Sequence, residues 1–208
     1  MLVRAYMNKP TAQQPRPYRM RAREAAAAET GRRILRSVID LHTERFHDQI
    51  TLEDVAARAG VTVQTVLRRF GSREELVSAA ADYAMTQVLV QRGEAPVGNV
   101  PGSVDNLLDH YEAWGASVLR LLAQEDRVPQ LRAMTDQGRE AHYAWVERTF
   151  APFLDGRSDG RLLQAKLIAL TDVYVWKVLH LDLRLDRAET AAALDEMIRA
   201  VLGEETGT

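Results

Sequence analysis

The sequence predicts an all-α protein: an N-terminal helix-turn-helix domain followed by a C-terminal helical bundle. Residues 51–75 carry the caps, turn and apolar spacing of two short helices and the start of a third. Apolar residues then recur at helical spacing through the rest of the chain, and no alternating pattern typical of β-strands follows. A length of 208 residues suits one or two domains.

Residues 51–70 predict two short helices joined by a tight turn. Thr51 is a typical N-cap residue, and Asp54 three positions later can complete the capping interaction. Gly60 is expected to end the first helix because glycine readily takes left-handed backbone angles. Val66 of the second helix faces inward and leaves polar side chains outside. This spacing indicates a helix-turn-helix, whose second helix lies in the DNA major groove. An ordinary helical hairpin is the alternative interpretation.

The wider segment 30–76 strengthens the DNA-binding interpretation. Its informative residues are Ile34, Leu35, Val38, Phe46, Thr51, Ala59-Gly60-Val61, Thr65, Phe70 and Ser72-Arg73-Glu74-Glu75-Leu76. With these residues the segment resembles the DNA-binding domain of the tetracycline-repressor (TetR) family. The resemblance implies a dimeric transcriptional regulator whose divergent C-terminal half binds a small-molecule effector.

Two positions depart from the family pattern. Many members have Gly or Pro where this chain has Gln64, and Tyr where it has Leu67. That tyrosine commonly contacts the DNA backbone, and leucine cannot donate the same hydrogen bond. Arg68 and Arg69 are expected to compensate with phosphate or base contacts.

The predicted DNA-binding residues lie on or beside the second helix of the motif. Gln64 is suited to adenine and Arg69 to guanine or a phosphate, whereas Thr51, Thr65 and Arg73 are suited to phosphate contacts that set the register. The full predicted set is Thr51, Thr62, Val63, Gln64, Thr65, Leu67, Arg68, Arg69 and Arg73.

The charge distribution fits this arrangement. The net charge is −2, but residues 1–75 hold 14 Lys and Arg against 9 Asp and Glu, whereas residues 76–208 hold 13 against 20. A basic N-terminal part suits contact with phosphates. The absence of cysteine excludes disulfides and thiolate metal sites. No long apolar run or secretory signal is present, so we expect a cytoplasmic protein without a membrane span.

Three segments follow from composition and periodicity. Residues 1–24 are expected to form a basic, disordered arm, which either follows the DNA or is a solvated tail; Met20 as the natural start is a third alternative. Residues 25–75 form the predicted DNA-binding domain, with a first helix from Ala25 to Phe46. Residues 76–208 form the predicted effector-binding and dimerisation domain.

The C-terminal part is expected to contain several helices. A helix opened by a full capping box at residues 72–75 runs to about residue 91, and residues 93–102 form a loop. Helices follow over residues 103–124, 129–137 and 139–150, with Gly138 separating the last two. Residues 161–183 predict one helix that is apolar nearly all round, and a last helix begins after residue 186.

An all-round apolar helix must be buried on more than one side, which indicates a partner subunit. Two helices from each subunit would form a four-helix dimer interface. The predicted interface residues are Leu167, Tyr174, Val178, Leu194, Met197, Ile198 and Val201. A fully intramolecular core is the alternative.

Aromatic residues and methionines collect after the DNA-binding domain, where they can line an apolar pocket for a flat or apolar effector. The predicted pocket residues are Tyr83, Tyr111, Trp114, Met134, Trp145 and Tyr174. Candidates for an added polar contact are Asp109, His110, Glu112, His142 and Asp172. Filling a core is the alternative role for each of them.

These observations predict a ligand-responsive transcriptional regulator, in particular a repressor that a small molecule releases from a palindromic operator. The sequence has no phosphate loop, no His-x-x-x-His pair and no Gly-x-Ser-x-Gly elbow, so we expect neither an enzyme nor a cofactor. The histidines and carboxylates also lack metal-ligand spacing. An effector-independent regulator and a small-molecule-binding protein with a degraded DNA reader remain the alternatives.

Overall fold

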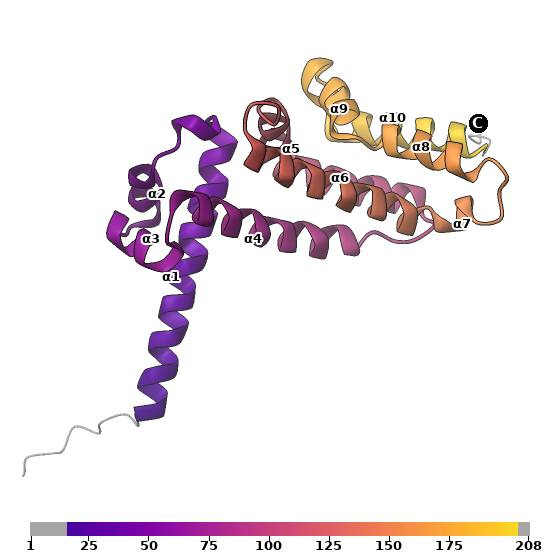
Figure 1. Ribbon diagram of the computed structural model, residues 1–208. Helices are drawn as coiled ribbons and strands as arrows, with labels where there is room; N and C mark the ends of the chain where they lie inside the picture. The colour runs from indigo at the N-terminus through magenta and orange to yellow at the C-terminus, as the bar shows by residue number, and fades with distance from the viewer. Residues whose placement is uncertain (1–15, 204–208) are drawn as a thin grey trace, which may run out of the picture.

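A computed structural model describes residues 16–203, with side chains from Met20 onward, and this part is helical without a strand. The N-terminal half of helix α1 (Arg16–Glu44) projects away at one end of the molecule, and α4 to α10 extend to the side from its upper part (Figure 1). The described helices include none that is long and apolar enough to cross a membrane.

The N-terminal domain packs α1, the 3₁₀ turn His47–Gln49, α2 (Leu52–Ala59) and α3 (Val63–Phe70) around one core. The two short helices match the predicted helix-turn-helix. Thr51 caps α2 and exchanges hydrogen bonds with Asp54 in a complete capping box. Gly60 ends α2 with φ of +63°, in the left-handed region that glycine tolerates.

Val66 is completely buried at the angle between α2 and α3, as predicted. The core around it is built from apolar side chains of α1, α2, α3 and the start of α4: Ile34, Val38, Leu41, Ile50, Val55, Ala56, Ala59, Val66, Leu76, Val77 and Ala80. This core therefore continues into α4, past residue 75.

The expected disordered arm is only partly described, and the described part differs from the prediction. Helix α1 begins at Arg16, well before the expected start at Ala25, so residues 16–24 are helical. Pro17 lies in the first turn of α1. Backbone N–H groups in a first turn have no acceptor within the helix, so the missing N–H of proline costs no hydrogen bond there. Residues 1–15 lie outside the described part of the chain.

Helix α4 (Arg73–Gly93) joins the two parts of the molecule. The predicted capping box at its start is only half formed. The Ser72 hydroxyl accepts the Glu75 N–H, but the Ser72 N–H bonds to the Phe70 carbonyl, so it does not need the Glu75 carboxylate. Residues 94–99 then connect α4 to α5.

Two predicted boundaries were wrong in this region. Helix α5 (Val100–Leu122) starts earlier than residue 103, because Asn99 caps it and Pro101 fits the first turn. Helix α6 (Pro129–Thr149) is continuous through Gly138, which was expected to separate two helices. Both ends of α6 pack against neighbouring helices, and this packing outweighs the modest cost of one interior glycine.

The remaining helices form a layer on the far side of α5 and α6 from α4 (Figure 1). They are α7 (Ala151–Leu154), α8 (Gly160–Leu170), α9 (Val173–Trp176), which runs into a π-helical turn (Lys177–Asp182), and α10 (Arg187–Leu202). Asp186 and Glu189 form a complete capping box at the start of α10, as predicted.

The single helix expected over residues 161–183 is broken at Thr171 and Asp172. The Thr171 carbonyl accepts the buried Tyr111 hydroxyl from α5 at 2.7 Å. Asp172 adopts an extended backbone with ψ of 151° and its side chain caps Tyr174. A contact from a distant helix therefore stabilises the break, which periodicity within the segment does not reveal.

Candidate functional site

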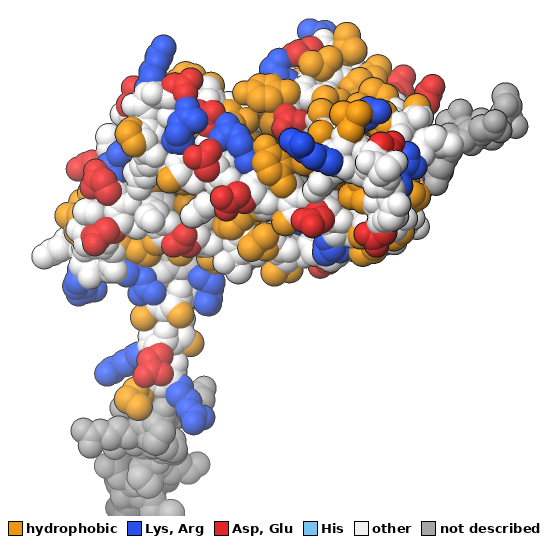
Figure 2. Space-filling model, turned by 45° about the vertical axis from the view of Figure 1, so that its right-hand side comes forward, with side chains coloured by type: hydrophobic (Ala, Val, Ile, Leu, Met, Phe, Trp, Pro, Cys, Tyr) orange, Lys and Arg blue, Asp and Glu red, His pale blue; other side chains and the backbone are white. Residues whose placement is uncertain are grey.

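The outer face of α3 presents short polar side chains and one arginine to solvent. Thr62 caps the helix and its hydroxyl lies 2.9 Å from that of Thr65. Gln64 and Arg68 are exposed, whereas Val63 is half-buried against the N-terminal core. Lys and Arg side chains gather along the lower edge of the body, where the N-terminal domain lies, and continue on α1 below it (Figure 2). This face can contact base edges and phosphates.

Leu67 and Arg68 are the least constrained of the predicted DNA-binding residues. Leu67 is 39% exposed, although it is apolar and lies on a helix of the N-terminal domain. Arg68 has no ion pair or side-chain hydrogen bond among the described residues. A free guanidinium beside an exposed apolar side chain suits phosphate or guanine contacts next to a thymine methyl group.

Arg69 is exposed but lies against α1. Its guanidinium rests on Gly31, which has no room for a Cβ atom beside Arg69 Nη2, and it also lies over the Phe70 ring at 5.8 Å. In this conformation the Arg69 side chain is directed to α1, and a base contact would require it to rotate.

Two of the residues expected to bind phosphate have internal partners instead. Arg73 donates to the Ile50 and His47 carbonyl oxygens and contacts His47 Nε2 at 3.1 Å. Thr51 donates its hydroxyl to Asp54 and accepts the Asp54 N–H. These contacts hold the 3₁₀ turn and α2 in place, and the phosphate roles of Arg73 and Thr51 stay predictions.

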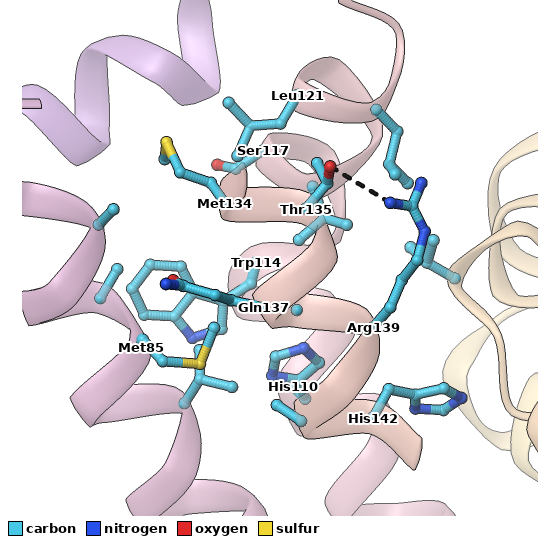
Figure 3. A pocket seen from close by; sticks show the side chains of 18 of the residues that line it. Met85, His110, Trp114, Ser117, Leu121, Met134, Thr135, Gln137, Arg139 and His142 are labelled. Carbon is cyan, nitrogen blue, oxygen red and sulfur yellow. Dashed lines mark hydrogen bonds between the residues drawn. The ribbon is translucent and has the colours of Figure 1, made fainter. Parts of the chain in front are cut away.

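A cavity of about 240 Å³ lies between α1, α4, α5, α6 and the start of α9. Met85 from α4 and Trp114 and His110 from α5 converge on this space, with Gln137 of α6 across from them (Figure 3). Its wall also includes Val38, Ile39 and His42 of α1. The cavity is therefore shared between the DNA-binding domain and the C-terminal helices.

The structure places four of the six predicted pocket residues in the cavity wall: Tyr111, Trp114, Met134 and Tyr174. Trp145 is buried in the C-terminal core beside Phe150, and Tyr83 lies elsewhere on α4, so neither lines this cavity. Helical periodicity cannot separate a cavity wall from a filled core, because both are apolar faces.

The polar candidates divide in the same way. His110, His142 and Asp172 line the cavity, whereas Asp109 and Glu112 lie on the surface and form ion pairs with Arg187 of α10. Sequence reasoning missed Arg92, a buried arginine near the end of α4 that also lines the cavity. No local signal distinguishes it from a surface arginine.

The predicted dimer interface is only partly accessible. Leu167, Leu194 and Ile198 are completely or almost completely buried within the protomer, which leaves no surface for a partner, and their assignment is corrected. Tyr174 and Val178 are about half exposed, and Met197 and Val201 are half-buried. Further exposed apolar residues on the same helices are Leu162, Leu181 and Leu183. Hydrophobic side chains gather over these C-terminal helices (Figure 2).

Comparison with known proteins agrees with this architecture. The family model described as bacterial regulatory proteins, tetR family, matches residues 34–80. The HTH-type transcriptional repressor Rv3405c of Mycobacterium tuberculosis is 29% identical over 175 residues, which are 84% of this chain and 80% of that protein. The HTH-type transcriptional regulator AlkX of the same organism is 38% identical over 93 residues, 42% of this chain and 40% of that protein.

Solved structures share the fold over almost their whole length. A transcriptional regulator from Rhodococcus sp. Rha1 superposes with a TM-score of 0.66 at 18% identity, covering 83% of this chain and 96% of that chain. A protein described as a TetR-family transcriptional regulator, from Mesorhizobium loti, superposes with a TM-score of 0.63 at 18% identity. The match covers 85% of this chain and 96% of that chain.

An all-α chain with a helix-turn-helix at one end and a cavity-bearing helical domain at the other belongs to the class of helix-turn-helix transcriptional regulators. Within this class, residues 34–80 match the TetR family of bacterial regulatory proteins, and the relatives named above are HTH-type transcriptional regulators. The family and the relatives are transcriptional regulators rather than enzymes, in agreement with the sequence-based prediction.

Proposed function

We propose that this protein is a homodimeric repressor that a small molecule releases from a palindromic operator. The observation that carries the proposal is the position of the cavity, whose wall joins α1 of the DNA-binding domain to α4, α5 and α6. A ligand that changes the packing of these helices must change the orientation of the N-terminal domain. An effector-independent regulator would instead be expected to have a filled core.

Three hydrogen bonds link the two parts of the chain beside this cavity. The His47 N–H donates to Gln124 Oε1 at 3.0 Å, Arg120 donates to the Thr43 carbonyl at 3.1 Å, and Gln130 donates to the Glu74 carbonyl at 2.9 Å. Movement of α5 or α6 is thereby passed to the 3₁₀ turn and to the start of α4, which directly follows α3.

The proposed mechanism is a shift between two dimer geometries. A dimer reads two half-sites about one DNA turn apart, roughly 34–36 Å. A ligand that binds more tightly to a geometry with another spacing of the two α3 helices weakens DNA binding by linkage. The partly exposed apolar face with Tyr174, Val178, Met197 and Val201 supports a dimer through the C-terminal helices.

For the DNA contacts we propose Thr62, Gln64, Thr65, Leu67 and Arg68 as the principal set. Gln64 can pair with adenine, and Leu67 can contact a thymine methyl group in place of the backbone contact of a tyrosine. Arg68 supplies the charge, since it has no ion pair or side-chain hydrogen bond within residues 16–203.

Selection of binding sequences from a random double-stranded DNA pool near physiological salt tests the function. Recovery of a palindrome with half-sites one turn apart is the expected result. Weak, steeply salt-dependent binding without a motif would contradict the proposal and would leave only non-specific attraction to phosphates.

The Arg68→Gln variant tests the recognition face on the selected sequence. Loss of one charged contact is expected to cost about 1–3 kcal/mol, or roughly 5- to 150-fold in affinity, without loss of the dimer. Fluorescence anisotropy measures the affinity, and sedimentation measures the oligomeric state. Arg157→Gln, at an exposed ion pair with Asp159 distant from α3, is the matched control. Equal affinities for both variants would remove Arg68 from the interface.

A further inference from the structure

Arg92 is a buried cation in the cavity wall. It lies near the C-terminal end of α4 and is only 6% exposed. Its guanidinium lies 4.3 Å from the centre of the Trp145 ring, and Nη2 lies 2.8 Å from His142 Nδ1. Burial lowers the pKa of Arg92 to about 10, so the group still carries its charge near neutral pH.

No negative charge among the described residues compensates Arg92. Its Nη1 atom is buried without a hydrogen-bond partner, and none of the ion pairs involves it. Another cation, Arg148, lies beside it and donates to the Arg92 and Ala95 carbonyl oxygens. Burial of an unpaired charge costs several kcal/mol, which aromatic faces and a helix C-terminus offset only in part.

The carboxylates near the cavity form no ion pair with Arg92 among the described residues. Asp172 lines the wall, but its Oδ1 accepts the Tyr174 N–H at the start of α9. Glu125 pairs with Arg139, the other arginine of the wall. The two histidines closest to Arg92 are neutral, because burial lowers the pKa of His110 to about 3 and that of His142 to about 4.

Two further polar atoms of the same wall have no partner. His110 Nδ1 and Ser117 Oγ are buried without a hydrogen bond among the described residues, and both side chains come from α5. His110 lies between Met85 and His142 in the view of Figure 3. The rest of the wall is mainly apolar, with Val88, Val118, Leu121 and Leu122 beside the aromatic residues.

We infer that the cavity binds a small amphipathic monocarboxylate, with its carboxylate on Arg92 and its apolar body among Met85, Trp114 and the aliphatic side chains. One unpaired guanidinium matches one negative charge, whereas a phosphate dianion would leave a buried charge uncompensated. A cavity of about 240 Å³ is just below the usual range of roughly 300–1,000 Å³ and therefore requires a small ligand. That this ligand is the effector rests on the proposed function.

Matched probe pairs test the charge preference directly. Octanoate with octanamide, and cinnamate with cinnamamide, keep the apolar body and exchange the charge for a neutral group. Isothermal titration of the full-length protein near pH 7 is expected to show each carboxylate binding about 10- to 100-fold more tightly than its amide, the range of a charge-assisted hydrogen bond. Equal affinities within both pairs, or no binding of either carboxylate, would overturn the inference.

Arg92→Met and Arg139→Gln separate the two arginines of the wall. Arg92→Met keeps the apolar stem and removes the charge, so the preference for carboxylate should disappear. Arg139→Gln should keep the preference, because Glu125 and Asp136 already pair with Arg139. Arg92→Gln is a second neutral variant if the methionine variant does not fold. A preference that persists in a folded neutral variant would place the anion elsewhere and overturn the inference.

Operator binding distinguishes this inference from the proposed function. If the protein selects an operator but shows no carboxylate preference, the inference fails and the regulator stands. If carboxylates bind through Arg92 but no operator is selected, the ligand class stands and the repressor proposal fails. If the protein both selects an operator and binds carboxylates through Arg92, octanoate or cinnamate should weaken operator binding by the wild-type protein more than by Arg92→Met.

Discussion

Single glycines within the C-terminal helices have opposite surroundings. Gly115 of α5 faces Trp176 of α9, and a Cβ atom there would lie 2.5 Å from the indole ring. The ring is buried and packed against Tyr111 at 5.6 Å, so it has little room to move. Gly138 of α6 has nothing within 4 Å of its Cβ position. One glycine is therefore required by packing, and the other only weakens its helix.

We expect Gly115→Ala to lower the free energy of unfolding by about 1–3 kcal/mol, because the methyl group overpacks the α5–α9 contact. Gly138→Ala should raise it by about 0.5–1 kcal/mol, because alanine favours the helix. Urea denaturation of both variants beside the wild type measures the two changes. If both variants changed the free energy of unfolding equally and with the same sign, the Trp176 ring would be shown to move aside at little cost.

At the scale of the elements, Arg73 joins α4 to the turn after α1. Its guanidinium bonds to His47 and Ile50, and His47 in turn contacts His42 of α1 at 3.2 Å. These contacts determine where α4 begins relative to α3. Arg73, which the sequence suggested for a phosphate contact, therefore also positions the helix that links the two domains.

Arg73→Gln should destabilise the N-terminal domain by about 1.5–3 kcal/mol, the range for hydrogen bonds to a charged group. Thermal unfolding followed by circular dichroism measures the change. Arg68→Gln is the control and should leave the stability unchanged, since Arg68 has no internal partner. Unchanged stability of Arg73→Gln together with weaker DNA binding would restore its phosphate role.

For the whole molecule, the buried histidines couple stability to pH. Burial is the main cause that lowers the pKa of four histidines: His42, His47, His110 and His142. The pKa falls to about 4 for His47 and His142 and to about 3 for His110. The unfolded chain takes up these protons near pH 6.5, and the folded chain does so only at lower pH. Between about pH 6.5 and pH 4 the unfolded state therefore binds more protons.

Stability should accordingly be complete above about pH 6.5 and fall as the pH decreases below it. Each buried histidine contributes roughly 1.4 kcal/mol per pH unit within this window. Urea denaturation at about pH 7.5, 6.5 and 5.5 measures how steeply the free energy of unfolding changes with pH. His110→Asn should reduce the slope, whereas a profile that stays flat to pH 5 would show that the histidines are not held neutral.

The helix-turn-helix was predictable because its signals act over short distances. Thr51 and Asp54, Gly60, and Asp186 with Glu189 each begin or end a helix through bonds to residues within a turn. Val66 was predicted to lie in the core for the same reason, because the spacing of apolar residues along a helix determines which face is buried. These local rules also predicted the exposed polar face of α3.

Only the tertiary structure decided the break at Thr171, the cavity and the charge of its wall. The break depends on the Tyr111 hydroxyl from α5, and the surroundings of Arg92 come from His142, Trp145 and Arg148, all at least fifty residues away in the sequence. Leu167, Leu194 and Ile198 face their own core for the same reason. The sequence by itself determined the helix-turn-helix, with its caps and its buried face. Packing between distant helices determined what the protein can bind inside, because an apolar face has the same spacing whether it meets a neighbour, a partner or a ligand.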